Sequence, residues 1–149
     1  MKRLWSLLLV LLLIPCLVVA ASAATSGTCG ENLSWIFDAD SETLTISGTG
    51  DMLDYSKSPF ISQRASVKKV VIEEGVTGIG NHAFLNMNYM TEISIPASVT
   101  RIGEYAFEYC MKLTEITVPD GVRSIGKYAF YDCRSLVTAS LGNELETIG

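Results

Sequence analysis

The feature that most constrains this chain is a repeat with a period of 23 residues in its carboxy-terminal half. One part of each repeat is an isoleucine followed by a glycine, and four residues further on comes an alanine followed by a phenylalanine. The isoleucine-glycine pairs stand at 79–80, 102–103, 125–126 and 148–149, and the alanine-phenylalanine pairs at 83–84, 106–107 and 129–130. Valine, leucine and isoleucine positions upstream keep the same register, so the chain is a stack of similar units.

One unit can be interpreted residue by residue. In LTEITVP (113–119), Ile116 and Val118 alternate with polar residues as in a short strand with one buried face, and the proline that follows ends the strand. VRSIG (122–126) predicts a second short extended segment with its valine and isoleucine inward. The glycine then allows a turn, and KYAFYDC (127–133) predicts a helical turn that buries its alanine, phenylalanine and cysteine.

One such unit cannot bury its own apolar side chains, whereas stacked units form a continuous core at the strand spacing of roughly 4.8 Å. A period in this range with an L-x-x-L-x-L spacing is the pattern of a leucine-rich repeat. The sequence therefore predicts a β-rich α/β solenoid over residues 67–149. Because the chain stops in mid-unit at Gly149, we expect the last repeat to be incomplete and the sequence to be a fragment or a truncated gene product, which leaves any carboxy-terminal cap, anchor or further domain out of view.

The unit LTEITVPDGVRSIGKYAFYDCRS resembles the BspA-like leucine-rich repeat of bacterial surface proteins, whose pattern is LxxIxIPxxVxxIGxxAFxxCxx. The resemblance covers residues 67–149, and two positions depart from it: Met87 replaces the cysteine of the first unit and Gly142 the proline of the last. It implies an exported, surface-displayed binding module, a class of which some members are implicated in adhesion to host or partner-cell proteins.

The segment 25–66 does not follow the period and is expected to cap the first repeat. Residues 33–37 and 43–47 predict two strands joined by a polar turn, which is a β-hairpin. The side chains expected to cover the first repeat are Trp35, Leu44 and Ile46. Gly48-Thr49-Gly50 is expected to break the second strand, and the stretch to Ser66 to run as a loop along the core. This arrangement also resembles the segment that often precedes BspA-like repeats.

Residues 1–24 have the order of a secretory signal peptide. The basic pair Lys2-Arg3 precedes an apolar run to Ala20, and small residues follow, with cleavage expected after Ala23 or Ala24. One alternative is an uncleaved membrane anchor, against which Pro15 and the small-residue exit argue. Another is a lipoprotein signal at Cys16, against which the proline before it argues. The sequence thus predicts a secreted or cell-surface protein, with membrane contact only through an uncleaved signal or an anchor.

Charge and cysteine content narrow the classes of partner. Without Lys2 and Arg3 the chain keeps nine basic and sixteen acidic residues, a net charge near −7, which weighs against nucleic acid. Three cysteines remain (29, 110, 133) without a CxxC motif, so neither a zinc knuckle nor a disulfide framework is indicated. Buried free thiols are the favoured interpretation, and a bridge between Cys110 and Cys133 stays open, although their Cβ vectors should run parallel.

No pattern in the sequence indicates catalysis or a cofactor. His82, the single histidine, shares a repeat position with Tyr105 and Tyr128, so it is interpreted as one ring of a stacked ladder. Asp38, Asp40 and Glu42 are spaced like the carboxylates of a calcium-binding loop, but Thr43 stands where such a loop requires glycine. A polar hairpin turn is therefore the favoured interpretation. We therefore expect no catalytic residue, no metal site and no cofactor; the chain is not predicted to be an enzyme.

What remains is a surface. Two side chains of each main strand point outward, and stacking should arrange them in rows, which the resemblance places on the concave sheet where partners dock. These candidate residues are Lys69, Val71, Glu92, Ser94, Glu115, Thr117, Thr138 and Ser140. The predicted partner is an extracellular protein, on a host or neighbouring cell, or a glycan. A structural spacer, or a non-catalytic accessory region of a larger secreted protein, is the alternative function. Tyrosines 105, 109, 128 and 131 form a second candidate patch, for which a stacking ladder is the alternative interpretation.

Overall fold

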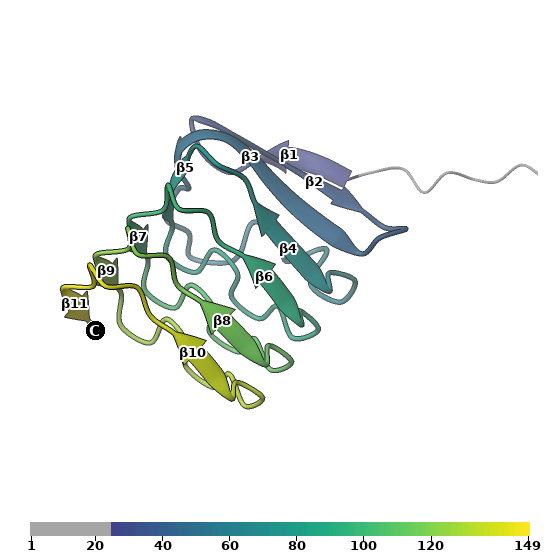
Figure 1. Ribbon diagram of the computed structural model, residues 1–149. Coiled ribbons are helices and arrows are strands. Elements are labelled where there is room, and N and C mark those ends of the chain that lie inside the picture. Colours follow the sequence, from purple (N-terminus) through teal and green to yellow (C-terminus); the bar gives the residue numbers. More distant parts are fainter. Residues whose placement is uncertain (1–24) are drawn as a thin grey trace, which may run out of the picture.

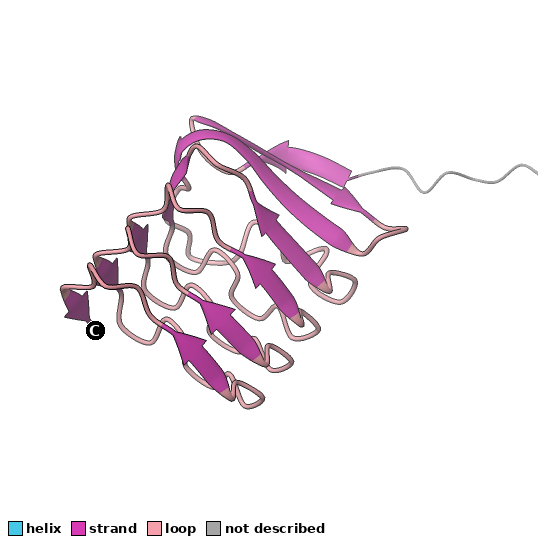
Figure 2. Ribbon diagram, in the orientation of Figure 1, coloured by secondary structure: helices cyan, strands magenta, loops and turns pink. Residues whose placement is uncertain are grey.

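The computed structural model describes residues 25–149, and all of its regular secondary structure there is β-strand (Figures 1 and 2). The predicted signal peptide lies outside the described residues. The strands are β1 (Thr25–Thr28), β2 (Asn32–Asp38), β3 (Thr43–Asp51), β4 (Lys69–Ile72), β5 (Val76–Ile79), β6 (Glu92–Ser94), β7 (Arg101–Ile102), β8 (Glu115–Thr117), β9 (Ser124–Ile125), β10 (Thr138–Ser140) and β11 (Thr147–Ile148).

Each repeat supplies one strand to each of two parallel ladders. The first ladder contains β4, β6, β8 and β10, and the second contains β5, β7, β9 and β11. Strands in both ladders pair with the residue 23 positions further on, for example Lys69 with Glu92 and Ile102 with Ile125. The chain is thus a β-solenoid of about 5 turns, which confirms the predicted leucine-rich-repeat architecture and is visible as stacked coils in Figure 1.

The amino-terminal end of the coil is covered by antiparallel strands. β2 and β3 form the predicted hairpin, and β1, which the sequence did not indicate, pairs with the outer edge of β2. Trp35, Leu44 and Ile46 are buried, as expected of side chains that cover the first turn.

The prediction that glycines end the second hairpin strand is wrong. β3 continues to Asp51 because Gly48 and Gly50 adopt φ values of 116° and 100°, a region that glycine enters without steric cost. Its first half pairs in parallel with β4 and its last two residues pair with β5, across a register shift at Gly50. The bent strand therefore starts both ladders, so the solenoid includes residues that the sequence assigned to the cap.

The stretch after β3 completes this first turn without keeping the 23-residue spacing. Phe60 is fully buried and stacks on Phe84 with ring centroids 5.4 Å apart. The hydroxyl of Ser58 donates a hydrogen bond to the carbonyl of Ala83 at 2.7 Å. A spacing of 24 residues between the two phenylalanines hides this equivalence from a search at a period of 23.

The predicted helical turn is also wrong, because alternate backbone N–H groups of this segment donate to the next coil, and those between them form only short turn bonds within their own coil, such as Leu85 to His82. His82 donates to Glu104, Phe84 to Ala106 and Asn86 to Glu108, at 2.8 to 2.9 Å. Two residues per turn hold a left-handed φ near 55–64°, for example His82 and Asn86. We call this part of each coil, residues 81–89, 104–112 and 127–135, the third side. Its alanine-phenylalanine pairs are buried as predicted, except that Phe130 in the last coil is only partly buried.

Side chains also satisfy backbone N–H groups of the following coil on this side. Asn81 Oδ1 accepts a hydrogen bond from the N–H of Glu104 at 2.7 Å, and Asp54 Oδ1 accepts one from the N–H of Asn81 at 2.8 Å. The second bond does not involve the Asn81 side chain. A substitution at residue 81 therefore removes one acceptor and leaves the other bond in place.

We expect Asn81→Ala to lower the free energy of unfolding by about 1 kcal/mol, the usual net value of one such hydrogen bond. Urea unfolding of this variant beside Asn81→Asp, which keeps a side-chain oxygen at the same place, measures it. An equal loss in both variants would show that the acceptor is not what Asn81 contributes.

Candidate binding surface

The first ladder aligns the eight predicted surface residues in two outward rows. The strands alternate, so that Val70 and Ile116 are buried while the residues on either side are exposed or half-exposed. One row contains Lys69, Glu92, Glu115 and Thr138, and the other Val71, Ser94, Thr117 and Ser140. The period-2 alternation therefore places these residues on one face.

The rows carry few strong interactions between side chains. The Nζ of Lys69 lies 2.8 Å from a carboxylate oxygen of Glu92, with both side chains about half exposed. Solvent screening limits such a pair to roughly 0–1 kcal/mol. Glu115, the next carboxylate in the row, lies opposite Thr138 and not opposite a basic residue. The surface is therefore rich in hydroxyl groups and weakly acidic.

Both rows continue onto the amino-terminal hairpin, an extension of the surface that was not predicted from the sequence. Thr43 pairs with Lys69 and Thr45 with Val71, and Thr45 in turn pairs with Ile36. Ile36 keeps 51% of its surface exposed although its neighbours Trp35 and Phe37 are buried. The alternation of the strand Asn32–Asp38 was the signal for this outward isoleucine, and it supplies the one large apolar side chain at that end of the surface.

The ladder that bears the rows consists of two separately paired parts. β4 and β6 pair with each other and with β3, whereas β8 and β10 form a two-stranded sheet of their own. The structure thus brings Lys69, Val71, Glu92 and Ser94 into direct register, and separately the four residues of β8 and β10. The second ladder joins the two parts, because β7 pairs with β9.

His82 is part of a ring ladder, as predicted. Its imidazole stacks on Tyr105 at 5.0 Å with an interplanar angle of 14°, and Tyr105 stacks on Tyr128 at 5.2 Å. Its buried Nδ1 has no hydrogen-bond partner within residues 25–149. This ring is held by stacking, and no carboxylate within the described chain orients it as in a catalytic triad.

The three described cysteines are free thiols, as predicted. The Sγ of Cys110 donates to the carbonyl of Phe84 at 3.4 Å, and that of Cys133 to the carbonyl of Phe107 at 3.1 Å, so each thiol bonds the preceding coil. Burial raises the pKa of Cys29 to about 11, and burial also raises the pKa values of Cys110 and Cys133. High pKa values keep these groups in the weakly reactive thiol form.

The buried Cys29 predicts a pH dependence of stability. Above pH 9 the thiol ionises in the unfolded chain, but in the folded chain it stays neutral to about pH 11. Its stabilising contribution is therefore complete below pH 9 and is lost as the pH rises to 11. We expect the stability difference between wild type and Cys29→Ala to shrink over that window, measured by urea unfolding at several pH values. A difference independent of pH would contradict the assignment.

The acidic hairpin turn is held by its own hydrogen bonds. The carboxylate of Asp38 accepts the N–H of Asp40 at 3.0 Å and the hydroxyl of Ser41 at 2.7 Å, and these bonds lower its pKa. Within residues 25–149 no three metal-ligating side chains gather at one point. No helix in the same part of the chain is long and apolar enough to cross a membrane.

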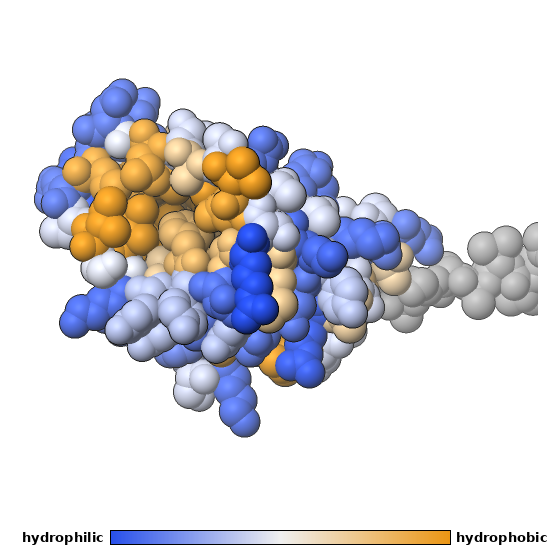
Figure 3. Space-filling view, turned by 90° about the horizontal axis from the view of Figure 1, so that it is seen from below, coloured by the Kyte–Doolittle hydropathy of each residue, from blue (hydrophilic) through white to orange (hydrophobic). Residues whose placement is uncertain are grey.

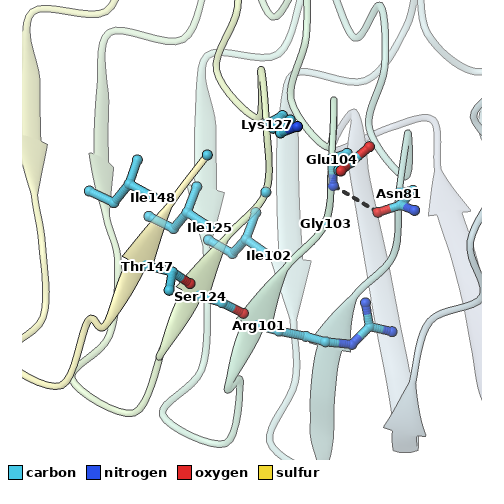
Figure 4. Close-up of a pocket in the computed structure, with 12 residues that line it drawn as sticks. Asn81, Arg101, Ile102, Gly103, Glu104, Ser124, Ile125, Lys127, Thr147 and Ile148 are labelled. Atoms are coloured by element: carbon cyan, nitrogen blue, oxygen red, sulfur yellow. Dashed lines mark hydrogen bonds between the residues drawn. The ribbon is translucent and has the colours of Figure 1, made fainter.

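An open groove of about 330 Å³ runs along the second ladder (Figure 4). Gly103 and Gly126 are among the residues that line it, and the isoleucines of three successive coils lie side by side along it. Arg101 points away from these isoleucines and forms an ion pair with Asp51 at 3.1 Å. The other charged residues that line the groove are Glu104 and Lys127.

The last described coil exposes apolar side chains at its open end. Figure 3 shows this end as a hollowed apolar area surrounded by polar residues. Val137 is 88% exposed, Ile148 64% and Leu141 48%. The residues equivalent to Ile148 and Leu141 in the preceding coil, Ile125 and Val118, are buried, whereas Thr114, which is equivalent to Val137, is exposed as well.

Comparison with known proteins places the repeats in a family. The family model described as the BspA type leucine-rich repeat region matches six copies over residues 56–149. The chain belongs to the BspA-type leucine-rich repeat family. The match begins within the stretch whose Phe60 stacks on the repeat phenylalanines, in agreement with the coil that this stretch forms. Leucine-rich repeats of this type are typical of bacterial surface proteins and are generally protein-binding and non-catalytic.

Solved bacterial leucine-rich repeat proteins have the same fold. A protein from Eubacterium ventriosum is 25% identical over 85% of this chain and 44% of its own, with a TM-score of 0.62. One from Bacteroides ovatus is 35% identical over 57% of this chain and 22% of its own, with a TM-score of 0.54. A leucine-rich cell surface protein from Faecalibacterium prausnitzii is 22% identical, covers 87% of this chain and 46% of its own, and has a TM-score of 0.50. The chain thus spans less than half of each of these relatives. A search of curated proteins found no match.

Proposed function

We propose that this BspA-type protein is an exported binding module, displayed at the cell surface or secreted, and that its first ladder contacts an extracellular protein or glycan. The observation that carries the proposal is the alignment of outward side chains in two rows, paired in register from Ile36 and Thr45 to β6 and again between β8 and β10. A row repeated at strand spacing presents the same kind of group several times along one face. Extended or repetitive ligands gain affinity from such repetition.

The chemistry of the rows supports a contact of modest strength. Hydroxyl groups predominate, and Ile36 is the largest exposed apolar side chain among the row positions. Tight interfaces usually depend on buried aromatic or arginine anchors, which these rows do not contain. Surface location is supported by the family and by the relative described as a cell surface protein.

Binding of the protein to a panel of extracellular-matrix proteins and glycans tests the proposal. The triple variant Glu92→Lys/Glu115→Lys/Thr117→Lys makes the rows strongly basic, because it removes two carboxylates and adds three ammonium groups. We expect saturable binding by the wild type and at least a tenfold loss in the triple variant.

The matched control is Glu31→Lys/Ser62→Lys/Glu146→Lys, which adds the same charge at exposed positions outside the rows. Equal weakening of both variants would show a nonspecific charge effect. Binding that the row variant retains would place the site elsewhere, and no binding to any member of the panel would favour the spacer function.

A further inference from the structure

The strand β1 leaves one edge of the amino-terminal sheet open, and in Figure 1 it lies at the outer side of the hairpin. Its only neighbour among the described strands is β2, with which it pairs antiparallel. In an antiparallel strand, alternate residues point both their N–H and C=O groups toward the same neighbour. About half of the backbone groups of Thr25–Thr28 therefore point away from β2 and have no strand partner within residues 25–149.

Nothing in β1 protects this edge against a further strand. Free edges are commonly blunted by a lysine, a proline or a β-bulge, because they otherwise pair with other chains. The sequence of β1 is Thr-Ser-Gly-Thr, and its register with β2 is unbroken over all four residues. Gly27 lies so close to Trp35 that an added Cβ would be 2.8 Å from the indole nitrogen. The strand is therefore held against the hairpin, and its outer edge is preformed.

The chemistry of this edge selects a polypeptide backbone as its ligand. The apolar core is closed at this end, because Trp35 and Phe37 of β2 are buried. The exposed side chains of β1 itself are two threonines and a serine. The free edges of β10 and β11 differ, because they lie beside the exposed Val137 and Ile148. A ligand of β1 is thus held by hydrogen bonds to its main chain, as in β-strand addition.

The charges around β1 select the side chains of that ligand. Residues 25–54 contain six carboxylates and no lysine, arginine or histidine. Three of the six form ion pairs with basic residues of the repeats: Glu42 with Lys68, and Asp51 and Asp54 with Arg101. The other three form no ion pair within residues 25–149, and these are Glu31, Asp38 and Asp40. The amino-terminal sheet therefore carries negative charge that no basic group of the described chain neutralises.

These three carboxylates lie beyond the two ends of β1. Glu31 follows the strand in the turn to β2. At the other end Thr25 pairs with Phe37, so Asp38 and the turn that contains Asp40 come next along the partner strand. Basic side chains on either side of an added four-residue strand would meet an opposite charge at each end.

We propose that β1 binds an extended basic segment of another polypeptide as an additional strand of the amino-terminal sheet. Neutral residues of that segment pair with Thr25–Thr28, and lysine or arginine residues on either side contact the acidic groups at the two ends. The site is the edge of this sheet and not the outward face of the first ladder, so it does not depend on the function proposed for that ladder.

The octapeptide KKTVTVKK is a probe of this chemistry, because its four central residues match the length of β1 and favour a strand. Two further versions carry N-methyl groups, one on the first and third central residues and the other on the second and fourth. Each version loses the central N–H groups of one edge only, so an added strand distinguishes them. Fluorescence anisotropy of the labelled peptides measures their affinity for the protein, and amide hydrogen exchange locates the contact.

We expect saturable binding of the parent peptide, a loss of at least roughly tenfold in affinity for one N-methylated version, and an affinity within about twofold for the other. The amide groups of β1 should exchange more slowly in the complex, whereas those of β8 and β10 should not change.

The role of charge is tested on the protein with Glu31→Gln/Asp40→Asn. Neither side chain makes a hydrogen bond or an ion pair within the described chain, so the variant should fold, and Asp38 is left unchanged because its carboxylate holds the turn. The matched control, Glu104→Gln/Glu146→Gln, removes the same charge at exposed positions of the repeats. The first variant should bind the parent peptide about threefold to tenfold more weakly, and the control within about twofold of the wild type.

Four results would each overturn the proposal. Equal affinities of all three peptides would show that no backbone ladder forms. Slowed exchange at β10 or β11 in place of β1 would put the added strand at the other end of the coil. A charge variant equal to its control would remove the role of the acidic groups, and no measurable binding of the parent peptide would contradict the strand addition itself.

Discussion

Replacing Phe107 by alanine should cost about 3–5 kcal/mol of unfolding free energy, enough to unfold a large fraction of a marginally stable chain. Its ring is fully buried and lies between Phe84 and Phe130, at 5.3 Å from each and nearly parallel to both. Truncation removes two stacked contacts and leaves a cavity that the coils on either side cannot close, because their backbones are hydrogen-bonded across it. Urea unfolding followed by circular dichroism measures the loss.

Phe130→Ala is the matched control for this effect. The same residue type stands at the same repeat position, but it is only partly buried and has one stacked neighbour in place of two. We expect roughly half the loss found for Phe107→Ala. Equal losses at both positions would mean that the ring stack does not govern the stability of the core.

Replacing Gly103 by alanine should cost about 3 kcal/mol, at the upper end of what overpacking costs, although its φ is not left-handed. A Cβ at this position would lie 2.6 Å from the backbone N of Asn81 and 2.6 Å from the carbonyl carbon of Gly80. Because both are backbone atoms of the preceding coil, the two coils must move apart to admit a methyl group, and their ladder hydrogen bonds weaken with them. Thermal unfolding and urea unfolding of the Gly103→Ala variant both measure this loss of stability.

Gly121→Ala provides the comparison. Its added Cβ would meet the carbonyl oxygen of Ala97 at 3.0 Å, a tight contact that a small shift of the exposed turn relieves. We expect a loss below about 1 kcal/mol there. If Gly103→Ala proved as mild as this control, the glycine column would not be required by the close approach of successive coils.

Much of this architecture could be predicted from the sequence because repetition and alternation are local signals. The period of 23 residues determined the stacking, and the alternation in each strand determined which side chains are buried, as in Ile116 and Val122. The same signals indicated the hairpin, the ring ladder at His82 and the outward rows. Each of these depends on a residue's type and spacing, which the sequence displays directly.

Other features depend on where backbone hydrogen bonds go, and only the tertiary structure decides that. The third side resembles a helical turn in sequence, but the N–H of Phe84 donates to Ala106 in the next coil. Gly48 and Gly50 look like a strand end, but with parallel strands available on two sides they let β3 bend and start both ladders.

The same distinction between local sequence signals and contacts between coils applies to the surfaces of the protein. The sequence by itself determined the repeat, the family resemblance and the rows of the first ladder, since each follows from residue identity at fixed spacing. Only the tertiary structure added Ile36 to those rows and showed that Tyr109 is held at a left-handed φ beside Tyr131. A side chain's neighbours and the conformation of its backbone are set by contacts between coils, and no single repeat encodes them.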